Sequence, residues 1–416
     1  MFAPVVRGAA RNGIMTSAPA RDPAQRQLRL LATVLFISYL CVGMALPVVP
    51  IHVTQQLGLS NAWAGLAVGI AFLSTVASRG FAGSLSDRRG AKLAVRRGLI
   101  FYAAGALMSA AAGLASLGAW PALAILVGGR LLLGLGESLV AVGVISWGIG
   151  LVGPARSGQV LALVGAAIYG AIAVGGPIGL VLFERLGFAV VMAISAGLPV
   201  LGLLAIRRVD GVAVLAGARR PSLWRVVGSI GPHGAIVCLQ GIGFAAIGAF
   251  FTLHFLQQHW QLAGLGLSAF GGGFVLMRMV FGHLPDRIGG LRLAMASLAV
   301  EAAGQLLIWG ASHPATALVG ALLTGLGCSM IFPAMGREVV NLVAPAMRGT
   351  ALGAFAAFQD LAYGLTGPLA GLVADRAGVS KVYLVGAAAA AAGLVIAIGL
   401  HRAARTSSTA ANSALR

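Results

Sequence analysis

The stretch GSLSDRRGAK, from Gly83 to Lys92, places four charged side chains within ten residues of a chain in which only 9% of residues are charged. A second stretch, GHLPDRIGGLR from Gly282 to Arg292, comes close to repeating it. In each case an Arg, a Gly and an Asp follow at intervals of four residues, and the second set lies 199 residues after the first: Arg79, Gly83 and Asp87, then Arg278, Gly282 and Asp286. A charged cluster that recurs at one spacing indicates an internal repeat.

The composition of the chain identifies its surroundings. Hydrophobic residues make up 59% of the 416 residues, and the mean hydropathy is +0.94. The few charged side chains cannot cover so much apolar surface, so the expected neighbour is a lipid bilayer. Windows of about 20 apolar residues, enough to cross about 30 Å of hydrocarbon, fit into the chain repeatedly. The twelve expected spans are 30–53, 60–84, 94–117, 120–149, 157–183, 187–206, 233–257, 263–284, 291–311, 314–343, 348–374 and 379–401.

The distribution of basic residues predicts the orientation of these spans. A net charge of +19 could indicate nucleic-acid binding, but the basic residues are scattered between apolar spans and do not gather on one soluble face, so no nucleic acid is expected. With these spans, 25 of the 29 Lys and Arg fall at the termini and the even-numbered turns. This asymmetry predicts that both termini lie in the cytoplasm. Residues 1–29 are polar, and the apolar run after them is too long for a signal-peptide core, so they are interpreted as a cytoplasmic tail.

The repeat extends over most of the chain. PIHVTQQ (50–56) matches TLHFLQQ (252–258), GLGE (134–137) matches GLGC (325–328), and GGPIG (175–179) matches TGPLAG (366–371). Matches in the same order predict two pseudosymmetric six-helix halves, an arrangement typical of transporters with a site between the halves. The expected division is a tail 1–29, a first half 30–206, a cytoplasmic linker 207–232, a second half 233–401 and a cytoplasmic tail 402–416.

Two other classes of membrane protein were weighed. A membrane enzyme needs a nucleophile with a base or a metal set, but the sequence has no Walker loop, no HExxH, no GxSxG and no metal-ligand cluster. Cys41, Cys238 and Cys328 fall in expected spans without CxxC spacing. A channel needs a continuous polar lining, whereas the polar residues here are sparse and central. Neither a metal nor a cofactor is expected, and the partners are protons, a small-molecule substrate and lipid.

Three motifs of the first half resemble those of the major facilitator superfamily. GSLSDRRGAK resembles its signature loop between helices two and three, GGRLLLGLGES its fourth-helix Arg motif, and YGAIAVGGPIG its fifth-helix Gly-Pro motif. Within that family, runs such as AFGGGFVLMRMVFGHLPDRIGG and FAAFQDLAYGLTGPLAG are similar to the YhhS/YfcJ-type transporters of the bacterial inner membrane. The resemblance implies an all-α membrane protein of twelve helices, transport by alternating access and an inner-membrane location; we expect it to act as a monomer.

The resemblance also implies a cytoplasmic gate. Asp87 would dock at the start of the eleventh helix near Arg348, and by pseudosymmetry Asp286 would dock near Arg156. A carboxylate at a helix N-terminus is stabilised by the amides and by the helix dipole. The alternative is that the cluster only sets topology, which would explain its arginines but not the paired Asp and Gly. The gating residues are Arg79, Gly83, Asp87, Arg88, Gly90, Arg278, Gly282, Asp286, Arg287, Arg156 and Arg348.

Charges inside the spans are the candidates for proton coupling, because each is costly in hydrocarbon. Arg130 and Glu137 lie seven residues apart, two helical turns, and so share a face of the fourth helix at about 10 Å axial separation. The resemblance implies a coupling role for Arg130, and Glu137 is predicted to carry the proton. The alternative for Glu137 is an interhelical hydrogen bond.

Asp360 is the carboxyl of the second half. In the repeat it is equivalent to Tyr169, whereas Glu137 is equivalent to Cys328, so each half keeps one carboxyl on a different helix. Such asymmetry is expected of a site rather than of a scaffold, although a structural role for Asp360 stays open. Glu301, one turn from Gln305, is interpreted as a structural hydrogen-bonding group.

Polar groups near mid-span are the candidates for substrate binding. They are Tyr39, Gln240, Tyr169 and Gln359. Gly176-Pro177 and Gly367-Pro368 mark matching helix bends. The fifth-helix Gly-Pro motif resembles the exporter form, which favours proton-coupled efflux of small amphipathic compounds or metabolites over the alternative, proton-coupled uptake of a sugar or organic acid.

Overall fold

The computed structural model describes residues 23–114, 117–153, 156–212, 223–344 and 347–414. Apart from connecting turns, the described residues are helical. The elements are α1 (Pro23–Ile51) with a π-helical turn η1 (His52–Gln56), α2 (Asn61–Arg89), α3 (Ala91–Ala111), α4 (Ala119–Val152), α5 (Ser157–Ala205) with a 3₁₀ turn η3 (Ile206–Arg208), α6 (Leu223–Gln257), α7 (Leu265–Phe281), α8 (Leu284–Ile288), α9 (Gly290–Trp309), α10 (Pro314–Leu342), α11 (Arg348–Ala377) and α12 (Ser380–Ala414).

These elements supply the twelve spans that the sequence predicts. In the described part of the chain, nine helices are long and apolar enough to cross a membrane, and α7 and α11 pack among them. The long α5 counts twice, because Gly187 breaks it with φ +77°, a backbone conformation that favours glycine. That break falls at the predicted boundary between the fifth and sixth spans. The five-residue α8 lies in a turn and crosses nothing.

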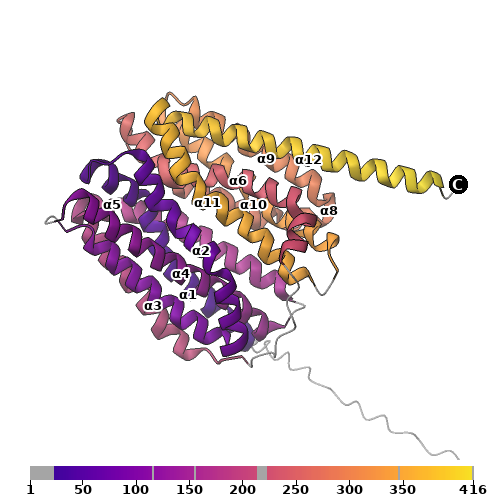
Figure 1. Ribbon diagram of the computed structural model, residues 1–416, viewed down its shortest axis with the longest axis horizontal. Helices are drawn as coiled ribbons and strands as arrows, with labels where there is room; N and C mark the ends of the chain where they lie inside the picture. The colour runs from indigo at the N-terminus through magenta and orange to yellow at the C-terminus, as the bar shows by residue number, and fades with distance from the viewer. Residues whose placement is uncertain (1–22, 115–116, 154–155, 213–222, 345–346, 415–416) are drawn as a thin grey trace, which may run out of the picture.

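The helices form two groups in the order of the chain. In Figure 1 the indigo-to-magenta elements α1 to α5 lie on one side, and the orange-to-yellow elements α9 to α12 lie on the other. The groups meet where α2 packs against α11, α5 against α7 and α1 against α6. Each partner pair joins one element from each half of the repeat. The predicted pseudosymmetric architecture is therefore confirmed, with its interface formed by these three pairs.

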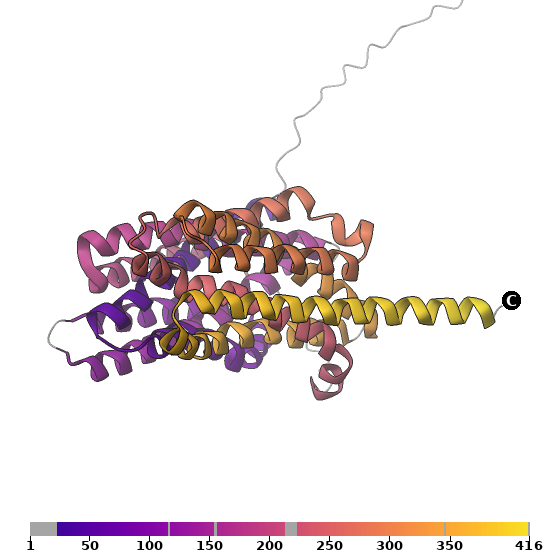
Figure 2. The same ribbon diagram turned by 90° about the horizontal axis from the view of Figure 1, so that it is seen from above.

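Several helices extend past the spans expected from hydropathy. α1 begins at Pro23 and α6 at Leu223, although the spans were expected at residues 30 and 233. α12 runs on to Ala414 and projects beyond the bundle in both views (Figures 1 and 2). Helix formation depends on the intrinsic helix propensity of the residues, and the Ala-rich end of α12 has a high propensity without needing to be apolar enough to cross a membrane. Hydropathy thus predicts the membrane-crossing part of each helix and not its full length.

The two halves approach most closely at the end of the bundle away from the chain termini. Gly65 on α2 lies directly against Gly367 on α11, and a Cβ on either glycine would collide with the other's backbone. At the second interface, Gly176 contacts the side chain of Leu267. Small residues at helix crossings allow this packing in membranes. The Gly-Pro motifs therefore lie at crossings between the halves, and the bends predicted there stay a prediction.

At the end that carries the chain termini, the same interfaces are looser. A Cβ built on Gly80 of α2, Gly158 of α5 or Gly353 of α11 would meet no heavy atom within 4 Å. The contact between the halves therefore weakens along α2, α5 and α11 towards the termini. This gradient is the property that an alternating-access transporter needs, since one end can be held closed while the other is free.

The repeated charged loops have matching backbones. Gly90 follows α2 with φ +94°, and Gly289 follows α8 with φ +87°. Residues with a Cβ rarely adopt such angles, so the tight turn into α3 and into α9 requires glycine. The structure thus assigns Gly90 of the predicted gating motif a backbone role. The repeat holds at this point down to the dihedral angles.

Candidate functional site

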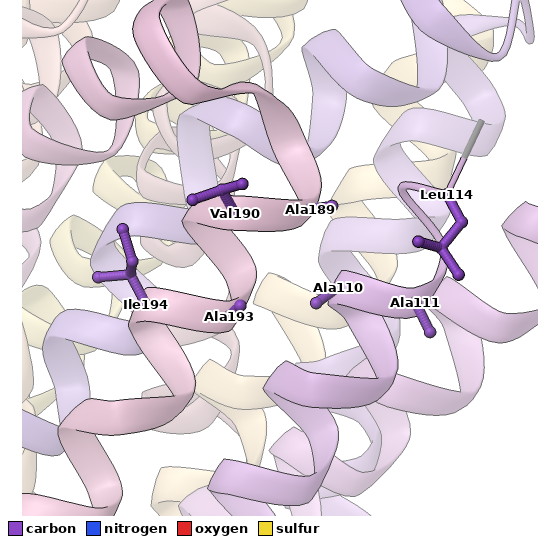
Figure 3. A pocket seen from close by; sticks show the side chains of 7 residues that line it. All are labelled: Ala110, Ala111, Leu114, Ala189, Val190, Ala193 and Ile194. Carbon is purple, nitrogen blue, oxygen red and sulfur yellow. The ribbon is translucent and has the colours of Figure 1, made fainter.

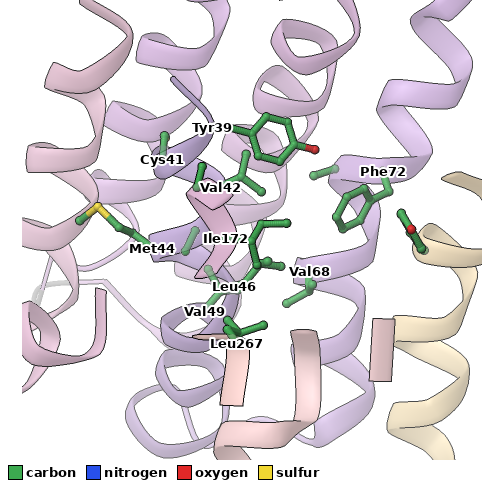
Figure 4. Packing of buried hydrophobic residues seen from close by; sticks show 14 of the residues in the cluster. Tyr39, Cys41, Val42, Met44, Leu46, Val49, Val68, Phe72, Ile172 and Leu267 are labelled. Carbon is green, nitrogen blue, oxygen red and sulfur yellow. The ribbon is translucent and has the colours of Figure 1, made fainter. Parts of the chain in front are cut away.

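Glu137 on α4 lies between helices of the first half and is paired with Tyr39 on α1. The hydroxyl of Tyr39 donates a hydrogen bond of 2.5 Å to Oε1 of Glu137. Glu137 is only 6% exposed, and its Oε2 has no hydrogen-bond partner among the described residues. Figure 4 shows the ring of Tyr39 beside apolar side chains, with its oxygen on the side that faces Phe72. The predicted proton carrier and one predicted substrate-binding residue are thus in direct contact.

Arg130 bonds to the neighbouring helix α2, in agreement with the axial separation of about 10 Å that argues against a direct salt bridge to Glu137. Its Nε donates to the carbonyl of Ala67 at 3.1 Å and its Nη2 to the carbonyl of Val68 at 3.5 Å, both on α2. It is 1% exposed, and the structure gives no ion pair between Arg130 and Glu137 within the described residues. The shared helix face is real, but the long side chain reaches across to α2. Arg130 therefore fastens α4 to α2 in this conformation.

The second carboxyl, Asp360 on α11, pairs with Arg79 on α2. Nε of Arg79 donates to Oδ2 of Asp360 at 2.5 Å, and Nη2 of the same arginine completes an ion pair with that oxygen. Arg79 was predicted in the gate and Asp360 in proton coupling, so this contact between them was not predicted. The pair joins the two halves at the α2–α11 interface.

The remaining predicted substrate-binding residues meet each other across helices. Nε2 of Gln359 on α11 donates to Oε1 of Gln240 on α6 at 3.4 Å. The hydroxyls of Tyr169 on α5 and Tyr363 on α11 lie 3.2 Å apart, which links the first half to the second. The Tyr169–Tyr363 contact therefore lies between the halves, as a site between repeats requires, whereas the Gln240–Gln359 pair lies within the second half.

A central aromatic cluster joins the two halves and was missed in the sequence analysis. The rings of Tyr169 and Phe274 stack with centroids 3.5 Å apart, those of Phe244 and Tyr363 lie 4.6 Å apart, and those of Phe72 and Tyr363 lie 5.4 Å apart. The cluster consists of Phe72, Tyr169, Phe244, Phe270, Phe274 and Tyr363. The spacing of Phe270 and Phe274, one turn apart, was the available signal. The central aromatic cluster presents an apolar surface beside the polar side chains of the predicted substrate site.

The predicted gate residues lie near the end of the bundle that carries the termini. Asp87 and Arg88 are exposed on the last turns of α2, and Arg348 is exposed at the start of α11. Nε of Arg156 donates to the carbonyl of Val152 at 2.9 Å. The side chain of Asp286 lies outside the described residues, so its predicted docking stays a prediction.

In the second half of the gating motif, the exposed Arg287 lies on α8, and Gly282 ends α7 without a positive φ. Gly83 of the first half is buried on α2, which leaves the Arg–Gly–Asp repeat intact in sequence but different in local backbone. The two signature loops are therefore related and not identical.

A carboxylate that the sequence analysis did not single out holds the opposite end of the bundle. Oδ1 of Asp375, near the end of α11, accepts hydrogen bonds from the backbone amide of Asn61 at 2.8 Å and from its side-chain amide at 2.9 Å. Oδ2 accepts from the amide of Ala62 at 3.1 Å. A carboxylate at a helix N-terminus is favourably placed for both hydrogen bonding and the helix dipole. Asp375 thus clamps the first turn of α2 across the interface between the halves.

Two hollows among the described residues differ in chemistry. The larger, of about 580 Å³, lies between α3 and the second part of α5 and is lined only by alanine, leucine, valine and isoleucine side chains (Figure 3). The smaller, of about 280 Å³, lies beside the Asp375 clamp and is lined in part by Thr54, Gln55, Asn61 and Gln257. Only the second lies between the halves and carries polar groups.

The sequence of the chain matches one family model over nearly its whole length. The model is described as Major Facilitator Superfamily, and it matches residues 31–230 and 234–414. The chain belongs to this superfamily. Relatives include an MFS-type transporter of Salmonella typhimurium, 42% identical over 370 residues that cover 88% of this chain and 94% of that protein. An MFS-type transporter of Burkholderia mallei is 43% identical over 380 residues, 90% of this chain and 92% of that protein.

Solved structures of the superfamily have the same fold. The nucleoside transporter NupG, crystallised as a point mutant, aligns with a TM-score of 0.74 at 14% identity, covering 90% of this chain and 99% of that one. The human organic anion transporter MFSD10 aligns with a TM-score of 0.65 at 15% identity, covering 90% and 99%. At such identities the likeness concerns the fold alone.

Membership confirms the transporter class and excludes the enzyme class that the sequence analysis weighed, because members of the superfamily carry small molecules across a lipid bilayer. The chain is a multi-pass membrane transporter with bacterial relatives. The narrower resemblance to the YhhS/YfcJ-type subgroup stays a prediction.

Proposed function

We propose that this member of the superfamily is a proton-coupled exporter of small amphipathic compounds or metabolites, working as a monomer. Its location would be the bacterial inner membrane, with both termini in the cytoplasm, as the distribution of basic residues favours. The observation that carries the proposal is the Glu137 carboxyl, 6% exposed, with one oxygen bonded to Tyr39 and the other without a partner among the described residues. A buried carboxyl without a cation can hold a proton and release it when its surroundings open.

Separate contacts support alternating access. The Asp375 clamp closes the end away from the termini, and the contact is looser at the other end, where Gly80 and Gly353 face open space. Asp87, at the looser end, is proposed to close it in the opposite state by docking near the start of α11. Transport would then alternate between closure by Asp375 and closure by Asp87.

The proposed gates make a paired prediction. Asp375→Asn removes the charge and one acceptor oxygen from two backbone contacts; at this exposed site the loss is about 1.4 kcal/mol, so that end should open about tenfold more often. In purified, detergent-solubilised protein that lacks native cysteines, the substitution should speed maleimide labelling of Thr54→Cys. Asp87→Asn should instead speed labelling of Gly353→Cys.

Asp210→Asn is the matched control, because the carboxylate of Asp210 accepts a hydrogen bond from the side chain of Gln27 on α1, away from both proposed gates. It should leave both labelling rates unchanged. Equal rates for Asp375→Asn and wild type at Thr54→Cys would contradict the clamp. If Asp87→Asn leaves the labelling rate of Gly353→Cys unchanged, the cytoplasmic gate is contradicted.

The side chains at the junction of the halves support a small amphipathic substrate. The central aromatic cluster supplies apolar area, and the polar groups beside it are few: the Gln240–Gln359 pair, the Tyr169–Tyr363 pair and the Arg79–Asp360 ion pair. A mostly apolar site with a few placed polar groups suits such solutes better than a heavily hydroxylated sugar. The names of the structural neighbours, a nucleoside transporter and an organic anion transporter, are compatible with this range. Uptake of a sugar or organic acid by proton symport is the second candidate.

The direction of transport can be tested once a substrate is found by comparing solutes retained in deletion and overexpressing cells. Inverted membrane vesicles energised to an acidic lumen should accumulate that substrate and release protons when it is added, because an exporter exchanges it for lumenal protons. A pH-sensitive dye and radiolabelled substrate measure the two fluxes, and an uncoupler should abolish both. Whole cells that concentrate the substrate while their cytoplasmic pH falls would establish symport and contradict export.

A further inference from the structure

Arg278 on α7 is a cation at the interface between the halves that is only lightly held. Its Nη2 donates to the backbone carbonyl of Ser329 on α10 at 2.6 Å. Its Nη1 faces α5 of the other half, lying 3.5 Å from where a Cβ on Gly165 would sit. Its Nε is buried and has no hydrogen-bond partner among the described residues. A guanidinium has five N–H donors, so most of the capacity of Arg278 is unused.

No carboxylate neutralises Arg278 among the side chains that the structure describes. Its equivalent in the first half, Arg79, has the ion pair with Asp360. In the repeat, the position equivalent to Asp360 is Tyr169, which has no charge to offer. The α2–α11 interface is therefore neutralised within the protein, whereas the α5–α7 interface keeps an unpaired cation. An unpaired, half-buried charge is costly in a membrane protein unless a ligand supplies its counter-charge.

The surroundings of Arg278 are aromatic. Its guanidinium carbon lies 5.1 Å from the ring centroid of Phe274, one turn earlier on α7. Tyr169 stacks on that same ring, and its hydroxyl lies 3.2 Å from the hydroxyl of Tyr363. A planar cation, two hydroxyls and several ring faces therefore lie together at the junction of the halves. A guanidinium matches a carboxylate bidentately, and ring faces bind a flat apolar body.

Arg130, the other buried arginine, is less suitable for this role. Its Nε and Nη2 already donate to carbonyls of α2, and it is 1% exposed. The Nε and Nη2 donors of Arg130 are thus directed within the first half. Arg278 instead faces the opposing half, where a substrate between the halves would lie.

We propose that Arg278 binds the carboxylate of a small aromatic or amphipathic anion, whose apolar body lies against the central aromatic cluster. This inference rests on the proposed transport function and names its substrate class. A single guanidinium matches the charge of a monoanionic carboxylate better than that of a phosphate. Arg278 is then a substrate-recognition residue and not only part of the gating motif.

The test compares acids with their uncharged amides. Purified wild-type protein in detergent is heated with benzoate, phenylacetate, cinnamate or indole-3-acetate, each against its primary amide at the same concentration. At least one acid should raise Tm by about 2 °C or more, and its amide should raise it less. Arg278→Gln should remove the difference between acid and amide. Arg278→Lys keeps the positive charge but not the paired N–H donors of the guanidinium, so it should keep part of the difference between acid and amide.

Arg292→Gln is the matched control, since Arg292 is an exposed arginine on α9. It should keep the full response. The proposal is overturned if no acid shifts Tm, if acid and amide act equally, or if the response survives in Arg278→Gln. Should Arg278→Gln fail to fold, the Arg278→Lys protein decides, because an unchanged response there also overturns bidentate binding.

The vesicle proton-flux experiment judges the transport function separately. Proton movement driven by an uncharged substrate would support proton-coupled export and contradict the carboxylate site at Arg278. A carboxylate-specific Tm shift without any proton movement would sustain the site and contradict proton coupling.

Discussion

Replacing Asp360 by Asn should destabilise the transporter strongly, and replacing Arg79 as well should restore much of the stability. Removing one partner of a buried ion pair costs about 3–5 kcal/mol, because the other charge stays buried and uncompensated. The side chain of Arg79 is 29% exposed and that of Asp360 10%, so screening by water reduces the penalty below that range, to about 2–3 kcal/mol. The thermal midpoint and the yield of monodisperse protein measure the effect.

The two single variants should differ. Asp360→Asn leaves a guanidinium that cannot lose its charge, whereas Arg79→Gln leaves a carboxyl that can neutralise itself by taking up a proton. Asp360→Asn should therefore lower the midpoint more than Arg79→Gln. The neutral double variant leaves no lone charge and should lie nearer to wild type than either.

Arg376→Gln is the control on the same helix, since Arg376 is exposed on the last turn of α11. It should leave the midpoint unchanged. If the effects of Arg79→Gln and Asp360→Asn simply add in the double variant, the two side chains do not act as a pair and the interpretation fails.

The structure separates what the sequence could predict from what it could not. The spans, the two halves and the break at Gly187 follow from hydropathy and from the repeat, because both depend on local composition and on chain order. The Arg79–Asp360 pair cannot be predicted in this way. It depends on the position of α2 relative to α11 along their common axis, and the sequence of one half alone does not determine that position. Sequence analysis therefore found both residues and assigned them to different tasks.

Side-chain reach set a second limit. Helical spacing predicts that Arg130 and Glu137 share one face of α4, and the backbone of α4 agrees with this. The guanidinium nevertheless reaches the carbonyls of Ala67 and Val68 on α2. Several hydrogen-bond partners lie within reach of a long side chain, and residue spacing along one helix does not determine which of them it contacts.

The Asp375 clamp shows a third limit. Its signal was an acidic residue near the end of the eleventh span, and a lone charge at a membrane boundary is ordinarily a surface group. Its function depends on the first turn of α2, 314 residues earlier in the chain, lying within hydrogen-bond distance. Only the packed halves bring the two together.

The largest effect on transport is expected from Glu137→Gln. The amide keeps the shape of the side chain and can still accept the hydrogen bond from Tyr39, so the fold should survive. It cannot carry a proton, so accumulation against a gradient should be abolished. Exchange of substrate across proteoliposomes without a proton gradient should continue near the wild-type rate, because that process needs alternating access but no net proton movement.

Two variants separate this prediction from general damage. Glu184→Gln changes an exposed glutamate on α5 and should keep uphill transport. Tyr39→Phe removes the hydroxyl that holds Oε1 of Glu137 but leaves the carboxyl in place, so uphill transport should be slowed and not lost. The decisive comparison is between uphill accumulation and exchange in one Glu137→Gln preparation. If both survive, another group carries the proton; if both disappear from folded protein, Glu137 is needed for the conformational cycle itself, and the separation of coupling from alternation proposed for this carboxyl is wrong.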